Sequence, residues 1–149
     1  MKLIIQKVSS ASVETEGECI AKIQNGFLVL VGIGKNDTKE IVDQYIKKMI
    51  NLRIFPDENG KTNLSLSDVN GQILLVSQFT LYANCRKGNR PSFFDAGEPS
   101  KAQLLYEYMI EKVKESAPVV QTGKFGALMK VSLINEGPFT IILDENTFA

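Results

Sequence analysis

The sequence contains no histidine, and this absence excludes several kinds of chemistry. Ser-His-Asp and Cys-His catalytic groups, HExxH metalloproteases and histidine-ligated zinc all need that side chain. Cysteine is scarce as well: Cys19 and Cys85 lie far apart and form no CxxC motif, so they indicate neither a metal site nor a redox pair. Any catalysis must therefore proceed without the side chain that titrates near neutral pH.

Long apolar runs and an excess of one charge are also missing. No segment approaches the ~20 apolar residues that a membrane-spanning helix needs. The first eight residues are too short and too alternating for a signal peptide, so we expect a cytoplasmic protein without a membrane partner. With 17 basic and 17 acidic residues the net charge is zero, and RNA binding would need a local patch or a grip on one end.

The composition that is present is typical of a folded protein. Apolar residues make up 44% of the chain and charged residues 23%, which argues against disorder. A chain of 149 residues is also long enough to bury a core of its own. We therefore expect residues 1–149 to form a single domain.

Short apolar runs and alternating patterns predict a chain built mostly of strands. The expected strands cover residues 2–8, 12–15, 18–24, 27–33, 52–55, 72–77, 119–122, 129–134 and 139–143. Asn25-Gly26 between two apolar runs is a strong hairpin signal. Gly137-Pro138 separates the last two expected strands, and taken alone it predicts a hairpin turn.

Two segments show the 3.6-residue period of helices. One covers residues 41–50, with Asp37-Thr38 as the expected N-cap and Glu40 completing a capping-box pattern. The other begins at about Ser100 and ends before Pro118. Together these elements predict an α+β fold, in which a curved, mostly antiparallel, barrel-like β-sheet carries two main helices on one face.

Polar residues follow the continuous apolar run of the strand at residues 72–77. Ser77, Gln78 and Thr80 stand where burial is expected to continue, and buried hydroxyls and amides must be paired or used. One interpretation is that they satisfy backbone groups at a sheet edge. The other is a catalytic site. A threonine hydroxyl needs a base in order to attack, whereas backbone N–H groups at the strand end could hold a carbonyl oxygen in an oxyanion hole.

Two further segments allow both an ordinary and a functional interpretation. Arg86, Lys87 and Arg90 form either a solvated loop or a grip on one or two phosphates. Gly137-Pro138 is either a plain turn or a rigid backbone wedge that is aimed at a ligand, since glycine tolerates unusual backbone angles and proline cannot donate to a ladder.

The segments Ser77-Gln78-Phe79-Thr80-Leu81 and Asn135-Glu136-Gly137-Pro138-Phe139-Thr140 resemble the two signature motifs of the D-aminoacyl-tRNA deacylases, SQFTL and NxGPxT. The resemblance extends along the whole chain. It includes residues 8–13, 52–55, 86–93 and 125–129, without large gaps.

This resemblance implies a homodimer, without metal or cofactor, that hydrolyses the ester between a D-amino acid and the 3′-terminal ribose of tRNA. D-Tyrosine is the typical residue removed, and achiral glycine is a further candidate. The Gly137-Pro138 bond would be cis, and the dipeptide would enter the active site of the partner subunit. Its carbonyl oxygens would clash with the side chain of an L-amino acid, so that selectivity comes from rejection.

The resemblance also implies roles for individual residues. Thr80 is one candidate nucleophile; the alternative gives the chemistry to main-chain groups around Gln78-Phe79 and to the terminal 2′-OH of the tRNA, and the missing base favours this alternative. Gln78 would then position the substrate, and the Phe79 N–H would hold its carbonyl. The site residues implied are Ser77, Gln78, Phe79 and Thr80 for catalysis, Phe125 and Met129 for the adenosine pocket, and Lys87 and Arg90 for tRNA phosphates.

Two positions depart from the family pattern. Phe139 stands where the family usually has valine, and Lys7 where it commonly has arginine. Lysine keeps the charge but loses the planar, bidentate fork, so a loop held by that fork must be held differently here. The rival hypothesis is a non-catalytic RNA- or DNA-binding module on the same fold, acting through the loop at residues 86–90.

Overall fold

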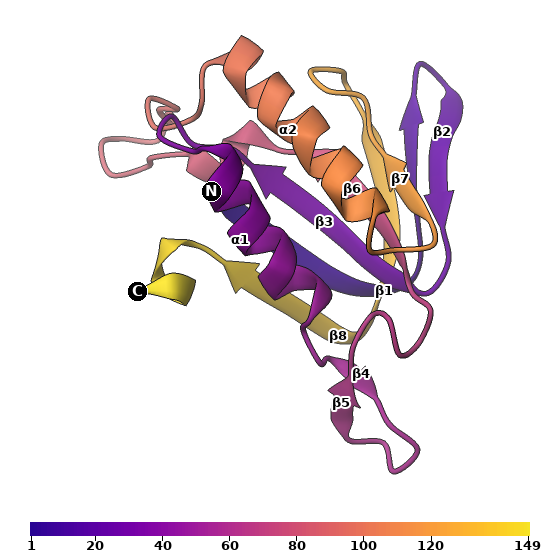
Figure 1. The fold of residues 1–149 in the computed structure, drawn as a ribbon. Helices are drawn as coiled ribbons and strands as arrows, with labels where there is room; N and C mark the ends of the chain where they lie inside the picture. The colour runs from indigo at the N-terminus through magenta and orange to yellow at the C-terminus, as the bar shows by residue number, and fades with distance from the viewer.

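The computed structural model describes all 149 residues as eight strands, two α-helices and two short 3₁₀ turns (Figure 1). The strands are β1 (Lys2–Thr15), β2 (Glu18–Ile23), β3 (Gly26–Gly32), β4 (Phe55–Pro56), β5 (Thr62–Leu64), β6 (Gln72–Ser77), β7 (Val120–Thr122) and β8 (Lys130–Leu143). The helices are α1 (Lys39–Ile50) and α2 (Pro99–Lys114), and the turns are η1 (Phe79–Tyr82) and η2 (Glu145–Phe148).

Strand β1 is the centre of the main sheet. It pairs antiparallel with β2 and β3 along one edge and with β8 along the other. Beyond β3 the order continues through β6 to β7, and both of these pairs are parallel. Each parallel pair is joined by a crossover that contains a helix, as parallel strands require. The expected α+β class, with a mostly antiparallel sheet, is confirmed.

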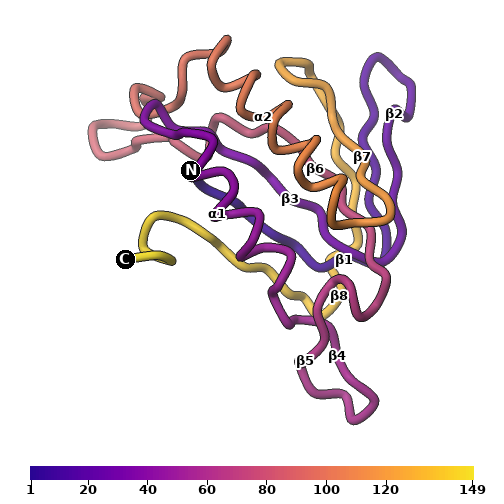
Figure 2. The backbone as a smooth tube through the Cα atoms, viewed as in Figure 1, coloured from indigo at the N-terminus to yellow at the C-terminus, as the bar shows by residue number.

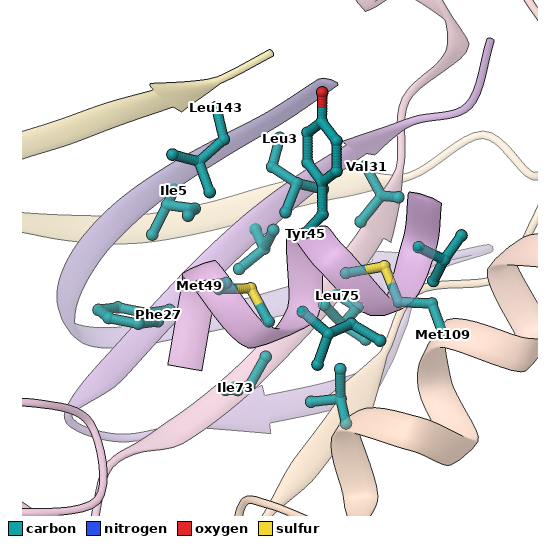
Figure 3. Close-up of a cluster of buried hydrophobic side chains, with 14 of the residues drawn as sticks. Leu3, Ile5, Phe27, Val31, Tyr45, Met49, Ile73, Leu75, Met109 and Leu143 are labelled. Atoms are coloured by element: carbon teal, nitrogen blue, oxygen red, sulfur yellow. The ribbon is translucent and has the colours of Figure 1, made fainter. Parts of the chain in front are cut away.

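The sheet separates two apolar clusters. Helices α1 and α2 lie side by side on one face, as the ribbon and the backbone tube both show (Figures 1 and 2). The larger cluster fills the space beneath them and includes Leu3, Phe27, Met49, Leu75 and Met109 (Figure 3). On the other face β2 lies against β6 and β7, so the sheet curls into a barrel-like shape around a smaller cluster.

Strand β6 shows why its apolar run is continuous. Ile73 and Leu75 belong to the cluster beneath the helices, whereas Leu74 and Val76 belong to the smaller cluster inside the curl. All four side chains are buried, because a parallel strand in the middle of a sheet is covered on both faces. The prediction of a buried strand at residues 72–77 is confirmed.

The hairpin prediction at Gly137-Pro138 is wrong. Strand β8 is one strand of 14 residues, and both of its halves pair with β1. Thr140 pairs with Gln6 and Asn135 pairs with Val8, so residues 136–139 form a bulge rather than a turn between partner strands. A bulge accepts proline because its residues are outside the hydrogen-bond ladder. Strand β1 likewise runs unbroken where two strands were expected.

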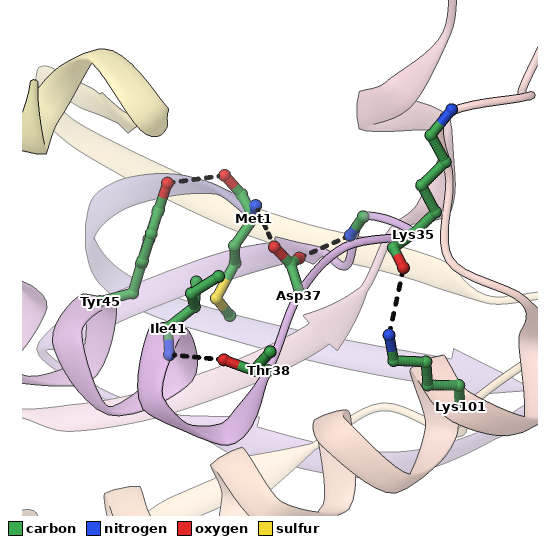
Figure 4. Close-up of polar contacts among 8 residues, drawn as sticks. Met1, Lys35, Asp37, Thr38, Ile41, Tyr45 and Lys101 are labelled. Carbon is green, nitrogen blue, oxygen red and sulfur yellow. Dashed lines mark hydrogen bonds and ion pairs between the residues drawn. The ribbon is translucent and has the colours of Figure 1, made fainter.

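The start of α1 differs from the expected capping box. Thr38 is the N-cap, and its hydroxyl accepts a hydrogen bond from Ile41 N at 3.4 Å. The Asp37 carboxylate is buried, and it instead pairs with the Met1 ammonium at 2.7 Å and accepts from Gly34 N at 2.6 Å (Figure 4). Because the Asp37 carboxylate binds Met1 and Gly34, it does not cap α1, and the expected capping box between Asp37 and Glu40 does not form.

Small differences concern the remaining elements. The strand expected at residues 52–55 is shorter and later, as β4, and it pairs with β5, which no sequence signal indicated. Helix α2 begins one residue before the expected start and ends before Pro118 as expected. None of the helices is long and apolar enough to cross a membrane.

Candidate active site

A cleft of about 750 Å³ opens where β6 ends. Its walls are the end of β6, the segment that leads into α2, and the loop between β7 and β8. Most of the side chains that line it are apolar. A mostly apolar cleft with a few polar groups at one end is typical of a small-molecule site.

Three residues of the SQFTL segment line this cleft, namely Ser77, Gln78 and Phe79. The Gln78 N–H donates to Val31 O at 2.8 Å, so the β3 ladder holds the backbone for one residue beyond β6. The chain then turns into η1, and the Phe79 side chain is 56% exposed. The first N–H groups of a helical turn have no partner within the turn, so they are available to donate hydrogen bonds to a ligand oxygen.

Thr80 does not line the cleft. Its hydroxyl oxygen accepts a hydrogen bond from the Gln78 amide nitrogen, which is the contact that the structure gives this hydroxyl. An amide is not a base, and histidine is absent from the chain. Hence the arrangement lacks the proton acceptor that a threonine nucleophile needs.

Phe125 and Met129, which the resemblance implies for the adenosine pocket, line the same cleft. The Phe125 ring packs against the Tyr106 ring with centroids 6.0 Å apart. Met129 lies against Gly123, where a Cβ atom would come within 2.7 Å of the Met129 sulfur. Glycine at position 123 therefore lets this methionine approach the strand and fixes the depth of the wall.

Among the cleft residues that sequence reasoning missed, two make specific contacts. Phe93 lines the cleft and meets Phe79 edge to face, with ring centroids 5.0 Å apart. Glu98 is the carboxylate of the lining and the N-cap of α2; hydrogen bonds from Ser100 and from the Lys101 N–H hold its pKa below the usual range. The Pro99 that follows was the available signal for this cap, since proline favours the first helical position.

The implied phosphate contacts lie outside the cleft. Lys87 and Arg90 are exposed on a loop that two backbone hydrogen bonds between Asn84 and Ser92 close, at 2.7 and 2.9 Å. Neither side chain lines the cleft, although the loop leads directly into Phe93. The structure thus places these two cations beside the cleft rather than in it.

Gly137 and Pro138 are exposed in the β8 bulge and do not line the cleft of their own chain. The peptide bond between them is cis. Asn135 closes the base of the bulge: its Oδ1 accepts from Phe139 N at 2.7 Å, and its Nδ2 donates to Thr140 Oγ1 at 2.8 Å. The polar residues of the NxGPxT motif therefore hold the two ends of the bulge together.

The two positions that depart from the family pattern are in contact. The Lys7 ammonium lies 5.7 Å from the centroid of the Phe139 ring, within the range of a cation–π interaction. This pair stands at the foot of the bulge, next to Pro138. The lysine thus contacts this segment through the aromatic ring and not through a bidentate fork.

The family model and the curated relatives name one family. The family model described as D-Tyr-tRNA(Tyr) deacylase matches residues 4–144. A D-aminoacyl-tRNA deacylase of Thermosipho africanus is 54% identical over 144 residues, and one of Finegoldia magna is 54% identical over 147 residues; these alignments cover 97% and 99% of both chains. A solved structure described as c-Myc DNA unwinding element binding protein has a TM-score of 0.92 at 40% identity and covers 97% of this chain and 99% of its own.

The family model and these relatives thus place the protein in a class of hydrolases. Within that class, the chain is a member of the D-aminoacyl-tRNA deacylase family. The resemblance carried by the SQFTL and NxGPxT motifs is confirmed. No three histidine, cysteine, aspartate or glutamate side chains gather to form a metal-binding group.

Proposed function

We propose that the protein hydrolyses D-aminoacyl-tRNA, such as D-tyrosyl-tRNA, to free D-amino acid and tRNA. The observation that carries this proposal is that Ser77, Gln78 and Phe79 line the same cleft as the apolar side chains of Phe125 and Met129. A polar backbone suits the ester, and apolar side chains suit the adenosine. Family membership supports the same reaction.

The backbone around Gln78 and Phe79 is the proposed catalytic element. The Phe79 N–H stabilises the oxyanion that forms when water adds to the ester carbonyl, and the Gln78 side chain positions the substrate. The ester C–O bond then breaks. The neighbouring 2′-OH of the tRNA gives its proton to the departing 3′-oxygen and takes up the proton that the attacking water loses, so that the products are the free amino acid and intact tRNA. Ser77 and Thr80 shape this segment.

Chiral selection is assigned to Gly137 and Pro138 of a second copy of the chain. Both residues are exposed on the bulge and lie outside the cleft of their own chain, which supports action in trans. Carbonyl oxygens of this dipeptide, placed against the α-carbon, would exclude an L side chain while admitting a D side chain. Achiral glycine has no side chain to exclude, so glycyl-tRNA is a second proposed substrate.

A homodimer is supported by strand β8, which pairs with β1 on one edge only. Its exposed side includes Ile134 and Ile142, which are 60% and 62% exposed. Long free edges with apolar side chains are normally covered in a native protein. A tRNA substrate further supports a cytoplasmic location, and Lys87 and Arg90 are the proposed phosphate contacts beside the cleft.

Release of tyrosine from D-tyrosyl-tRNA and from L-tyrosyl-tRNA, measured with EDTA present, tests this function. We expect turnover of the D-ester at catalytic enzyme concentrations and an L-ester rate equal to spontaneous hydrolysis. A matched control is Leu104→Ala, which changes an exposed residue of α2 outside the cleft. A D-ester rate that does not exceed the enzyme-free blank would refute the proposal.

Nucleic-acid binding without catalysis is the second candidate, because a structure at 40% identity is described as a DNA unwinding element binding protein. In that case, neutralising Arg86, Lys87 and Arg90 together should abolish binding to nucleic acid, while substitution of Gly137 should have no effect. If the protein is a deacylase, substitution of Gly137 should impair its activity more than neutralising the three cations does. Filter binding and deacylation assays on the same two variants separate the candidates.

A further inference from the structure

Phe94 is an aromatic side chain in an unusual position. It is 80% exposed, although its neighbour Phe93 lines the cleft. Asp95, on its other side, lines a second cleft of about 570 Å³. Phe94 therefore stands between the proposed active site and a second hollow in the surface, and nothing in the proposed function uses it so far.

The backbone that carries Phe94 is firmly held. Lys35 N donates to Asp95 O at 3.1 Å, and Gly97 N donates to Ile33 O at 2.8 Å. The Lys101 ammonium also donates to Lys35 O at 3.1 Å (Figure 4). Because hydrogen bonds fix both sides of Phe94, its exposure belongs to a defined loop and not to a frayed end.

The ring has one covered face. The Lys35 ammonium lies 4.1 Å from the centroid of the Phe94 ring and pairs with Asp95 Oδ1 at 2.8 Å. At 80% exposure the rest of the ring is open to a ligand. Lys35 also lines the second cleft, together with Lys2, Arg86 and the carboxylates of Asp37, Asp95 and Glu145.

We propose that Phe94 is a stacking platform for the unpaired nucleotide that precedes the terminal adenosine of the tRNA. This inference rests on the proposed function, in which the adenosine lies in the main cleft. The 3′ end must leave that cleft, and Phe94 lies in the chain between Phe93, which lines it, and Asp95, which lines the second cleft. Lys2 and Arg86 are the proposed contacts for the phosphate of that nucleotide.

An exposed aromatic ring with cations beside it is the usual design for binding single-stranded nucleic acid. Stacking of one base on an aromatic side chain is worth about 1–3 kcal/mol, or roughly 5- to 150-fold in affinity. Stacking tolerates any base, so the platform would add affinity for the tRNA end without selecting a particular tRNA. Selection of the amino acid would remain with the main cleft.

Steady-state kinetics on two substrates tests the proposal. Phe94→Ala should raise KM for D-tyrosyl-tRNA about tenfold, and it should leave the hydrolysis of 3′-O-D-tyrosyl-adenosine unchanged, because that compound lacks the stacked nucleotide. Phe94→Trp should retain the wild-type KM. Equal losses on both substrates, or no loss on the tRNA, would overturn the platform. Failure of the wild type on both would instead refute the proposed function.

A binding measurement decides the question independently of turnover. A short RNA that carries 2-aminopurine just before its terminal adenosine should lose fluorescence when it stacks on the wild type or on Phe94→Trp. The quenching should be absent with Phe94→Ala and present with Leu104→Ala, the matched exposed control. Equal quenching by all four proteins would overturn the proposal. A lower oligomer mass for Phe94→Ala in sedimentation would also overturn it, because the ring would then contact another copy of the chain and not the RNA.

Discussion

Replacing Thr80 by alanine separates the two mechanisms more sharply than any other single change. The structure gives its hydroxyl one contact, as acceptor from the Gln78 amide, and no base. If the hydroxyl only steadies Gln78, its loss removes one hydrogen bond. Such a bond is worth about 0.5–1.5 kcal/mol, which corresponds to roughly 2- to 13-fold in rate.

If Thr80 were the nucleophile, its replacement by alanine would lower the rate by several orders of magnitude. Removing the attacking residue of a hydrolase costs about 10⁶-fold in kcat. Single-turnover deacylation of D-tyrosyl-tRNA by Thr80→Ala, with Thr80→Ser and Gln78→Ala beside it, therefore distinguishes the two cases. We expect Thr80→Ala to stay within about 20-fold of the wild type. A rate at the spontaneous level, in a variant whose thermal unfolding and oligomeric state match the wild type, would refute the main-chain mechanism.

Three further predictions follow from other contacts. Gly137→Val should lower D-tyrosyl-tRNA turnover at least about tenfold. The reason is that φ at Gly137 is +136° and an added Cβ would lie 3.1 Å from Phe139 N. Normal turnover would show that the bulge takes no part in the active site. Lys7→Met should raise the L-to-D rate ratio about 2- to 5-fold, and adding Phe139→Leu should cause no further change, as a double-mutant cycle would show. Tyr106→Phe should lower unfolding free energy by about 1 kcal/mol at pH 7 through the lost bond to Leu75 O. Burial raises the pKa of the Tyr106 phenol, so the wild type loses its extra stability over Tyr106→Phe as pH rises above about 10. Urea titrations should show the difference in unfolding free energy between the two proteins becoming smaller.

The parts of the site that depend on local pattern could be predicted from the sequence. A continuous apolar run predicted β6 and, with it, the position of Ser77 and Gln78 at a strand end. The family resemblance added Phe125 and Met129, which the structure brings into the same cleft. Phe93 could not be found in this way, because an aromatic residue in a polar loop carries no periodic signal.

Long-range partners account for the errors. Asp37 has the residue type and the spacing of a helix cap, but the Met1 ammonium lies within 2.7 Å and takes its carboxylate instead. Capping patterns report only local competition, and here a contact with a residue 36 positions away decides the outcome. The same limit applies to Lys7 and Phe139, whose contact joins β1 to β8.

The NxGPxT motif is the clearest case, and its geometry explains its spacing. Read locally, glycine and proline between two strands mean a hairpin, but β1 supplies a common partner for both halves of β8. Asn135 then bonds to Phe139 N and to Thr140 Oγ1, which closes the bulge at its base. The bulge leaves Gly137 and Pro138 exposed with no functional group beyond the main chain. The motif therefore encodes a main chain that is exposed at a bulge, which is the geometry that the proposed contact with a second copy of the chain requires.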